Sequence, residues 1–175
     1  FTLGMPTFTF GRRVLAEAGE QARELDLRRV ALFTDKKLAA GPHVAKVVAS
    51  LKAAGVDIVV YDEVSIEPTD QSLQAAARFA VESRVDGYIS VGGGSVMDTC
   101  KAANLYASHP APLMTYVNAP IGEGKRCPGP VKPHIACPTT SGSITSRPAI
   151  PAPTRPTPVF LPSRGRCRRA SLRSA

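Results

Sequence analysis

Tryptophan is absent from this chain of 175 residues, and cysteine is scarce. The four cysteines, Cys100, Cys127, Cys137 and Cys167, form no CxxC pair. Cys127, His134 and Cys137 also match no common zinc-binding pattern. So few cysteines, without a signal peptide, indicate reduced thiols in a compartment like the cytosol.

Long apolar runs are also missing. No stretch approaches the roughly 18 consecutive apolar residues that a membrane span needs, and no leader of the secretory type opens the chain. The sequence therefore predicts a protein with no membrane partner. We expect it in the cytoplasm or, in a eukaryote, in the mitochondrial matrix.

Acidic residues and histidine are absent from residues 143–175, which contain seven arginines and six prolines. This segment carries a charge of +7, whereas residues 1–142 carry +1. We expect it to be disordered, because it cannot bury enough apolar surface to offset its ordering entropy. Its composition suggests a GC-rich coding sequence read out of frame, so we hypothesise a frameshift near residue 143. The alternative is a genuine basic tail that binds anions weakly; the near-neutral remainder argues against nucleic acid as a partner of the whole protein.

Residues 1–142 alternate between strand and helix patterns at short, regular spacing. Such alternation predicts an α/β domain, a parallel sheet with helices on both faces like a Rossmann domain. Right-handed crossovers place the carboxyl ends of the strands at one edge, where open α/β sheets bind ligands. The predicted strands cover residues 28–34, 56–62, 85–91 and 132–140, and the predicted helices cover residues 11–26, 41–55, 70–84 and 95–108.

A glycine-rich turn, Gly92-Gly93-Gly94-Ser95, joins the third predicted strand to a helix. Glycine lets backbone N–H groups approach an anion, and the helix N-terminus adds unpaired donors and a partial positive charge. A phosphate or pyrophosphate fits there. The alternative is a plain turn with Ser95 as the N-cap. The order is not G-x-G-x-x-G, and residues 121–126, IGEGKR, fail the Walker A pattern.

Other polar residues follow the predicted strands at the same edge. Asp35 can accept the ribose hydroxyls of an adenosine and would repel a 2′-phosphate, which favours NAD over NADP; alternatively, it is an N-cap for the segment from Lys36. Thr139 and Thr140 offer hydroxyls beside this edge, or form a polar turn.

The spacing GGGS-x-x-D-x-x-K, formed by Gly92–Ser95, Asp98 and Lys101, resembles the iron-containing (group III) alcohol dehydrogenases. The match covers residues 8–142. The runs CKAANLYAS and APIGEGK are most similar to the hydroxyacid–oxoacid transhydrogenase branch. Three further segments occur in the family's order: TDKKL at 34–38, EPTD at 67–70 and PTTSG at 138–142.

This resemblance implies an N-terminal domain that binds NAD or NADP, and a helical domain that holds Fe²⁺ or Zn²⁺ through one Asp and three His. It implies hydride transfer between a substrate carbon and nicotinamide, in this branch from 4-hydroxybutyrate to 2-oxoglutarate, by proteins that are often homo-oligomers. By position, Asp35 would contact the adenosine ribose, and Thr139 and Thr140 would lie toward the nicotinamide. The pyrophosphate would be bound by Gly93, Gly94 and Ser95, within the motif that also contains Gly92, Asp98 and Lys101.

The departure from the family begins after Gly142, where T-G-S-E is expected and Ser143-Ile144-Thr145 stands instead. No metal ligand follows, and we expect His43, His109 and His134 to be ordinary surface or turn residues. A metal contributes several kcal/mol to the reaction. We therefore predict a chain without useful dehydrogenase activity, lacking the helical metal-binding domain. The alternatives are a non-enzymatic nucleotide-binding fragment and an anion-binding module that depends on the basic tail.

Overall fold

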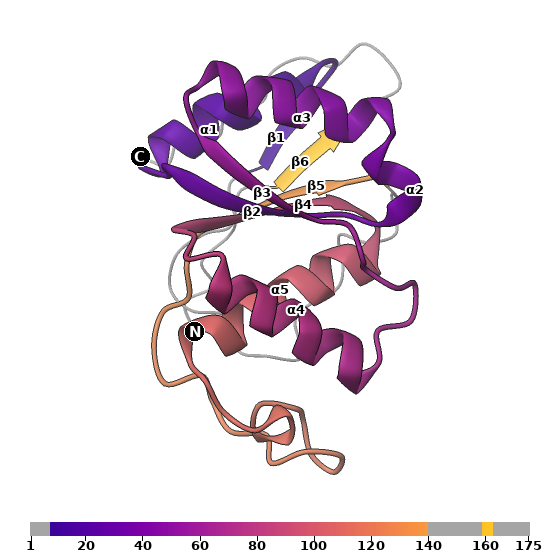
Figure 1. Cartoon of the computed structure of the whole chain (residues 1–175), viewed down its shortest axis with the longest axis vertical. Coiled ribbons are helices and arrows are strands. Elements are labelled where there is room, and N and C mark those ends of the chain that lie inside the picture. Colours follow the sequence, from indigo (N-terminus) through magenta and orange to yellow (C-terminus); the bar gives the residue numbers. More distant parts are fainter. Residues whose placement is uncertain (1–7, 140–158, 163–175) are drawn as a thin grey trace.

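Six parallel strands form one sheet in the described part of the chain, in the order β1-β6-β5-β4-β2-β3 (Figure 1). The computed structural model describes residues 8–139 and 159–162. Along the chain, the elements are β1 (Phe8–Gly11), the 3-10 helix η1 (Val14–Glu17), α1 (Ala18–Glu24), β2 (Arg29–Phe33), α2 (Lys36–Ala39), α3 (Pro42–Ala53), β3 (Asp57–Tyr61), α4 (Asp70–Glu82), β4 (Gly87–Gly92), α5 (Gly94–Ser108), the 3-10 helix η2 (Leu113–Thr115), β5 (His134–Pro138) and β6 (Val159–Pro162).

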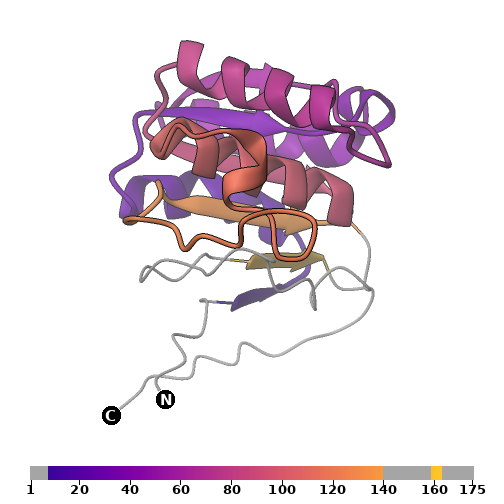
Figure 2. The ribbon, with the colours of Figure 1, turned by 90° about the horizontal axis from the view of Figure 1, so that it is seen from below.

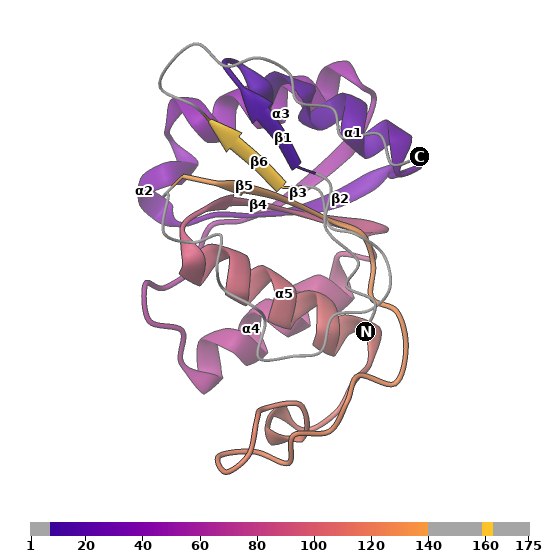
Figure 3. The ribbon, with the colours of Figure 1, turned by 180° about the vertical axis from the view of Figure 1, so that it is seen from behind.

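Helices cover both faces of this sheet (Figure 3). On one face, η1, α1 and α3 pack on a core to which β4 contributes Ile89 and Val91. On the other face, α4 and α5 pack on a second core, to which the same strand contributes Tyr88. All six residues of β4 are buried, because the strand lies between two neighbours and is covered on both sides. The layers confirm the predicted α/β fold.

The helix boundaries follow from local chemistry. Helix α3 begins with Pro42 in its first turn, where a missing N–H costs no hydrogen bond. Gly55 follows that helix with a φ of +75°, which only glycine adopts without strain. Helix α4 begins at a capping box in which Thr69 and Ser72 each accept from the other's backbone N–H.

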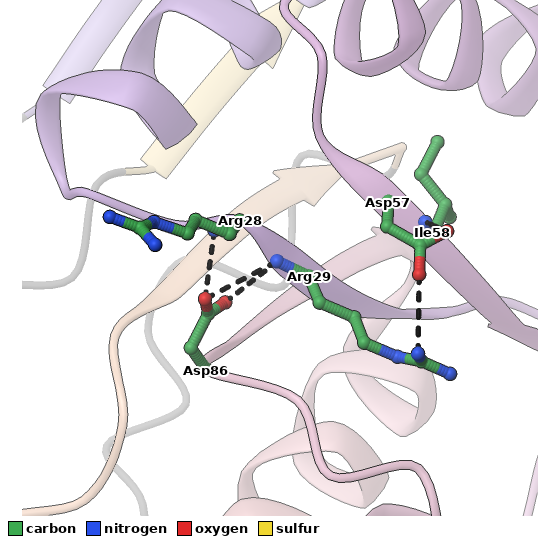
Figure 4. Close-up of polar contacts among 5 residues, drawn as sticks. All are labelled: Arg28, Arg29, Asp57, Ile58 and Asp86. Carbon is green, nitrogen blue, oxygen red and sulfur yellow. Dashed lines mark hydrogen bonds and ion pairs between the residues drawn. The ribbon is translucent and has the colours of Figure 1, made fainter.

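The amino end of the central strands is fixed by Asp86, which precedes β4 (Figure 4). Its carboxylate accepts hydrogen bonds from the backbone N–H of Arg28 at 2.8 Å and of Arg29 at 3.1 Å. The Arg29 guanidinium in turn lies 3.3 Å from the Asp57 carboxylate at the start of β3. One carboxylate thus sets the register of β2 against β4 at the edge opposite the glycine turn.

Residues 109–133 leave the sheet and return to it between α5 and β5 (Figures 1 and 2). The base of this excursion is closed by the amide of Asn104 on α5. Its Nδ2 donates to the carbonyl oxygen of Lys132 at 2.8 Å, and its Oδ1 accepts from the N–H of Lys132 at 3.2 Å. The Lys132 ammonium also donates to the carbonyl oxygen of Val85 at 2.7 Å. The excursion therefore starts and ends at one fixed point.

Three points of the prediction from the sequence need correction. The predicted helix over residues 11–26 is a 3-10 turn followed by a shorter helix, η1 and α1. Strands β1 and β6 and helix α2 were not predicted. Strand β6, Val159–Pro162, lies within the segment expected to be disordered, so for these four residues that prediction is wrong. The rest of residues 143–175, with the proposed frameshift and the basic tail, lies outside the described residues.

Candidate nucleotide-binding site

The glycine turn lies where the sequence predicts it, at the carboxyl end of the central strand β4. Gly93 is the N-cap of α5, and no side chain caps that helix. The first backbone N–H with a helical partner is that of Met97, which donates to the Gly93 carbonyl at 3.1 Å. Within the described residues, nothing accepts from the N–H groups of Gly94, Ser95 and Val96. Three donors at the positive end of a helix dipole can bind an anion.

The glycines of this turn have different reasons to be glycine. A Cβ on Gly92 would lie 2.5 Å from Cγ2 of Val96 and 2.8 Å from its Cβ, so Gly92 is required by packing. Gly93 has an extended backbone, with φ of −82° and ψ of −169°, that any residue can adopt. Backbone strain therefore does not explain the glycine at position 93.

The alternative of a plain turn expected Ser95 to be the N-cap, and this expectation is wrong. Ser95 is the second residue of α5. Its hydroxyl donates to the carbonyl oxygen of Ile66, in the segment between β3 and α4. Further along the helix, Asp98 and Lys101 lie one turn apart, with Oδ1 and Nζ separated by 3.7 Å. Asp98 is about half exposed and Lys101 about one quarter exposed, so this pair lies at the helix surface.

Asp35 follows β2 at the same edge, and its side chain caps α2. Oδ1 accepts from the N–H groups of Lys37 and Leu38, each at 2.9 Å. The N-cap reading is therefore correct. Both bonds fall on one oxygen, so Oδ2 stays available to a ribose hydroxyl, and the ribose contact stays a prediction. The backbone of Asp35 also pairs with Glu63 after β3, which holds the ends of these two strands together.

Threonines join the strand ends of the site. The Thr139 N–H donates to the Gly92 carbonyl oxygen at 2.9 Å, which places Thr139 beside the glycine turn. The fully buried Thr34 was not singled out from the sequence; its hydroxyl donates to the Val91 carbonyl oxygen at 2.9 Å. A threonine directly before Asp35 was the available signal. Thr140 lies outside the described residues.

His134 is fully buried on β5, so the expectation that it lies at the surface or in a turn is wrong. Its Nε2 is 2.8 Å from the Ser90 hydroxyl on β4. Burial, and secondly the Lys101 cation, lowers the pKa of His134 from 6.5 to about 3. A neutral histidine that is paired with a serine between two layers stabilises the fold and is closed to substrate.

The described residues offer no metal site. Within residues 8–139 and 159–162, no three His, Cys, Asp or Glu side chains gather where a metal could bind. His109 instead lies 3.1 Å from the Pro130 carbonyl oxygen.

No helix in this part of the chain has the length and apolar character for crossing a membrane.

A parallel sheet covered by helices on both faces, with a glycine turn at the end of a central strand, is the arrangement of Rossmann-like α/β domains. A sequence model of the family "Iron-containing alcohol dehydrogenase" matches residues 6–150. The chain belongs to this family, as the resemblance implied.

Curated relatives and solved structures agree with this assignment. The mouse mitochondrial hydroxyacid-oxoacid transhydrogenase is 47% identical over 144 residues, which are 82% of this chain and 31% of that protein. The human one is 46% identical over the same length. The chain thus spans about a third of the length of the curated relatives it matches. The alcohol dehydrogenase from Oenococcus oeni superposes with a TM-score of 0.76 at 28% identity, over 93% of this chain and 46% of that one.

A further match shows the fold alone. The sulfoacetaldehyde reductase from Bifidobacterium kashiwanohense, solved in complex with NAD⁺, superposes with a TM-score of 0.74 at 21% identity, over 93% of this chain and 46% of that one. The family is described as iron-containing, but the described residues of this chain do not supply a ligand set for iron.

Proposed function

We propose that this chain is the nucleotide-binding part of an NAD-linked, metal-dependent alcohol or hydroxyacid oxidoreductase. The observation that carries the proposal is the N-terminus of α5, where three backbone donors without partners among the described residues face the carboxyl edge of the sheet. The names of the transhydrogenase relatives favour a hydroxyacid as hydride donor and an oxoacid as acceptor. The family resemblance implies 4-hydroxybutyrate and 2-oxoglutarate in these roles.

Each part of the cofactor is bound by different residues of the site. The N–H groups of Gly94, Ser95 and Val96 bind the pyrophosphate, which the helix dipole stabilises further. Asp35 accepts a ribose hydroxyl through Oδ2 and repels a 2′-phosphate, so NAD is preferred to NADP. We assign Thr139 to the nicotinamide side; this is supported by the sheet order, in which β5 flanks the turn on the side away from Asp35. Thr140 has the same predicted role and lies outside the described residues.

We further propose that a polypeptide of this sequence binds cofactor but turns over no substrate by itself. In the family, a bound divalent metal polarises the substrate oxygen. No Asp, Glu or His follows Gly142 in this sequence, and the buried His134 is paired with Ser90. Of the two locations predicted from the sequence, the mitochondrial one is favoured by the names of the transhydrogenase relatives.

The test is an isothermal titration of the 175-residue protein with NAD⁺, and of two valine variants. Gly93→Val places a side chain in the path of the phosphates, and we expect it to weaken NAD⁺ binding at least about tenfold. Gly11→Val is the matched control, because a Cβ on Gly11 at the end of β1 meets nothing within 4 Å. Equal affinity of all three proteins, or no binding by the wild type, contradicts the proposal.

Turnover is measured separately. The wild-type protein is supplied with NAD⁺, 4-hydroxybutyrate and 2-oxoglutarate, with and without Fe²⁺ or Zn²⁺. We expect no product in either case, even where the titration gives binding. Metal-dependent formation of succinic semialdehyde would contradict the second part of the proposal and leave the first part standing.

A further inference from the structure

The loop between β3 and α4, residues 62–69, lies against the first turn of α5 and is called here the β3–α4 loop. The Ser95 hydroxyl donates to the Ile66 carbonyl oxygen, which joins two residues 29 positions apart. Since Ser95 is the second residue of α5, the bond attaches this loop directly to the helix end that faces the cofactor.

Both ends of the β3–α4 loop have anchors of their own. At one end, Glu63 pairs with Asp35, and the Val64 side chain is buried. At the other end, Thr69 is held by its capping box. The residues in between, 65–68, are all exposed. Among the hydrogen bonds of the described residues, only the one from Ser95 reaches this exposed stretch.

The direction of the bond decides what Ser95 can offer to a phosphate. A serine hydroxyl has one hydrogen to donate, and its two lone pairs can only accept. In this structure the hydrogen goes to Ile66, so the hydroxyl turns electron pairs toward any anion at the turn. A phosphate oxygen therefore gains nothing from this side chain, although it can still bind the backbone N–H groups.

We propose that Ser95 is a positioning residue: its hydroxyl holds the β3–α4 loop as a wall beside the phosphate site and does not contact the phosphate. This inference rests on the proposed cofactor site. It also changes the role that the family resemblance implies for Ser95, because the backbone and the side chain of one residue then have separate tasks. The loop becomes part of the surface that meets the rest of the dinucleotide.

The first test needs no cofactor. In Ser95→Ala the exposed stretch loses its tether, so we expect hydrogen exchange at the amides of residues 65–67 to rise, and cleavage after Glu63 by a glutamate-specific protease to become faster. Ser95→Thr keeps a hydroxyl and should restore both. Ser65→Ala is the matched control, because Ser65 lies in the same stretch and its hydroxyl takes part in no hydrogen bond with the described residues. Circular dichroism confirms that each variant is folded.

The second test distinguishes a Ser95 hydroxyl that positions the β3–α4 loop from one that contacts the phosphate. We expect Ser95→Ala to weaken NAD⁺ binding about five- to tenfold, the size of one net hydrogen bond, and to leave the binding of inorganic pyrophosphate unchanged. Equal weakening for both ligands, with unchanged exchange, overturns the inference in favour of direct contact. Unchanged exchange and unchanged affinities show that no tether exists. If the loop loosens but the wild type binds neither ligand, the proposed function fails while the tether itself stands.

Discussion

Replacing Gly92 by alanine separates packing from binding at the glycine turn. The new Cβ would lie 2.5 Å from Cγ2 and 2.8 Å from Cβ of Val96. The Val96 side chain is buried and belongs to the core between the sheet and helices α4 and α5. Val96 Cβ is one of the atoms in close contact, and rotation about χ1 does not move it, so a change of valine rotamer does not relieve the contact. Overpacking of this kind costs about 1–3 kcal/mol. For a domain of this size, the melting temperature should fall by about 2–4 °C per kcal/mol.

The assay is thermal unfolding followed by circular dichroism, for Gly92→Ala, Gly93→Ala, Val96→Ala and the double variant Gly92→Ala with Val96→Ala. We expect Gly92→Ala to melt earlier and Gly93→Ala to melt like the wild type, because the backbone of Gly93 suits any residue. The double variant should recover part of the loss beyond the sum of the single effects. If Gly92→Ala melts at the wild-type temperature, the packing argument is wrong.

Two further predictions concern pH and the opposite edge of the sheet. The pKa of His134 falls from 6.5 to about 3 on folding, so between these values the unfolded chain binds a proton that the folded chain does not. Stability therefore decreases as pH falls through this window, by about 1 kcal/mol per pH unit, and His134→Gln should flatten that dependence in urea titrations; an unchanged slope would refute it. Asp86→Ala removes two hydrogen bonds from backbone N–H groups to a charged carboxylate and should cost about 1–3 kcal/mol of unfolding free energy. Asp57→Ala breaks an exposed ion pair with Arg29 and an exposed hydrogen bond from the N–H of Ile58, and should cost about 0–1 kcal/mol. Equal costs for these two variants in the same titrations would contradict the assignment (Figure 4).

The parts of the fold that the sequence predicted are those with strong local patterns. Strands β2–β5 are apolar runs between turn residues, and helices α3, α4 and α5 have apolar periodicity or clear caps. Strands β1 and β6 have four residues each, and β1 gains its pairing from β6, about 150 positions away along the chain. No local pattern reveals such a partner, so these two short strands were missed.

The same limit applies to the candidate site. The turn at Gly92–Ser95 was found because its spacing and composition are local. The alternative of Ser95 as the N-cap was wrong, and the acceptor of its hydroxyl could not be predicted, since Ile66 comes from a different loop. His134 lies in the predicted strand 132–140 but was expected to be a surface or turn residue. Only the sheet order, which puts β5 between β4 and β6, explains its burial.

The closed base of residues 109–133 makes this excursion a place where the protein can be engineered. The side-chain amide of Asn104 forms hydrogen bonds with both the N–H and the carbonyl oxygen of Lys132. These bonds fix the point where the chain enters β5, and they do not involve the residues at the tip of the excursion. The entropic cost of a longer closed loop grows only slowly with its length. A reporter peptide or a small folded domain could thus be inserted at the exposed residue Ile121, with the cofactor edge left undisturbed.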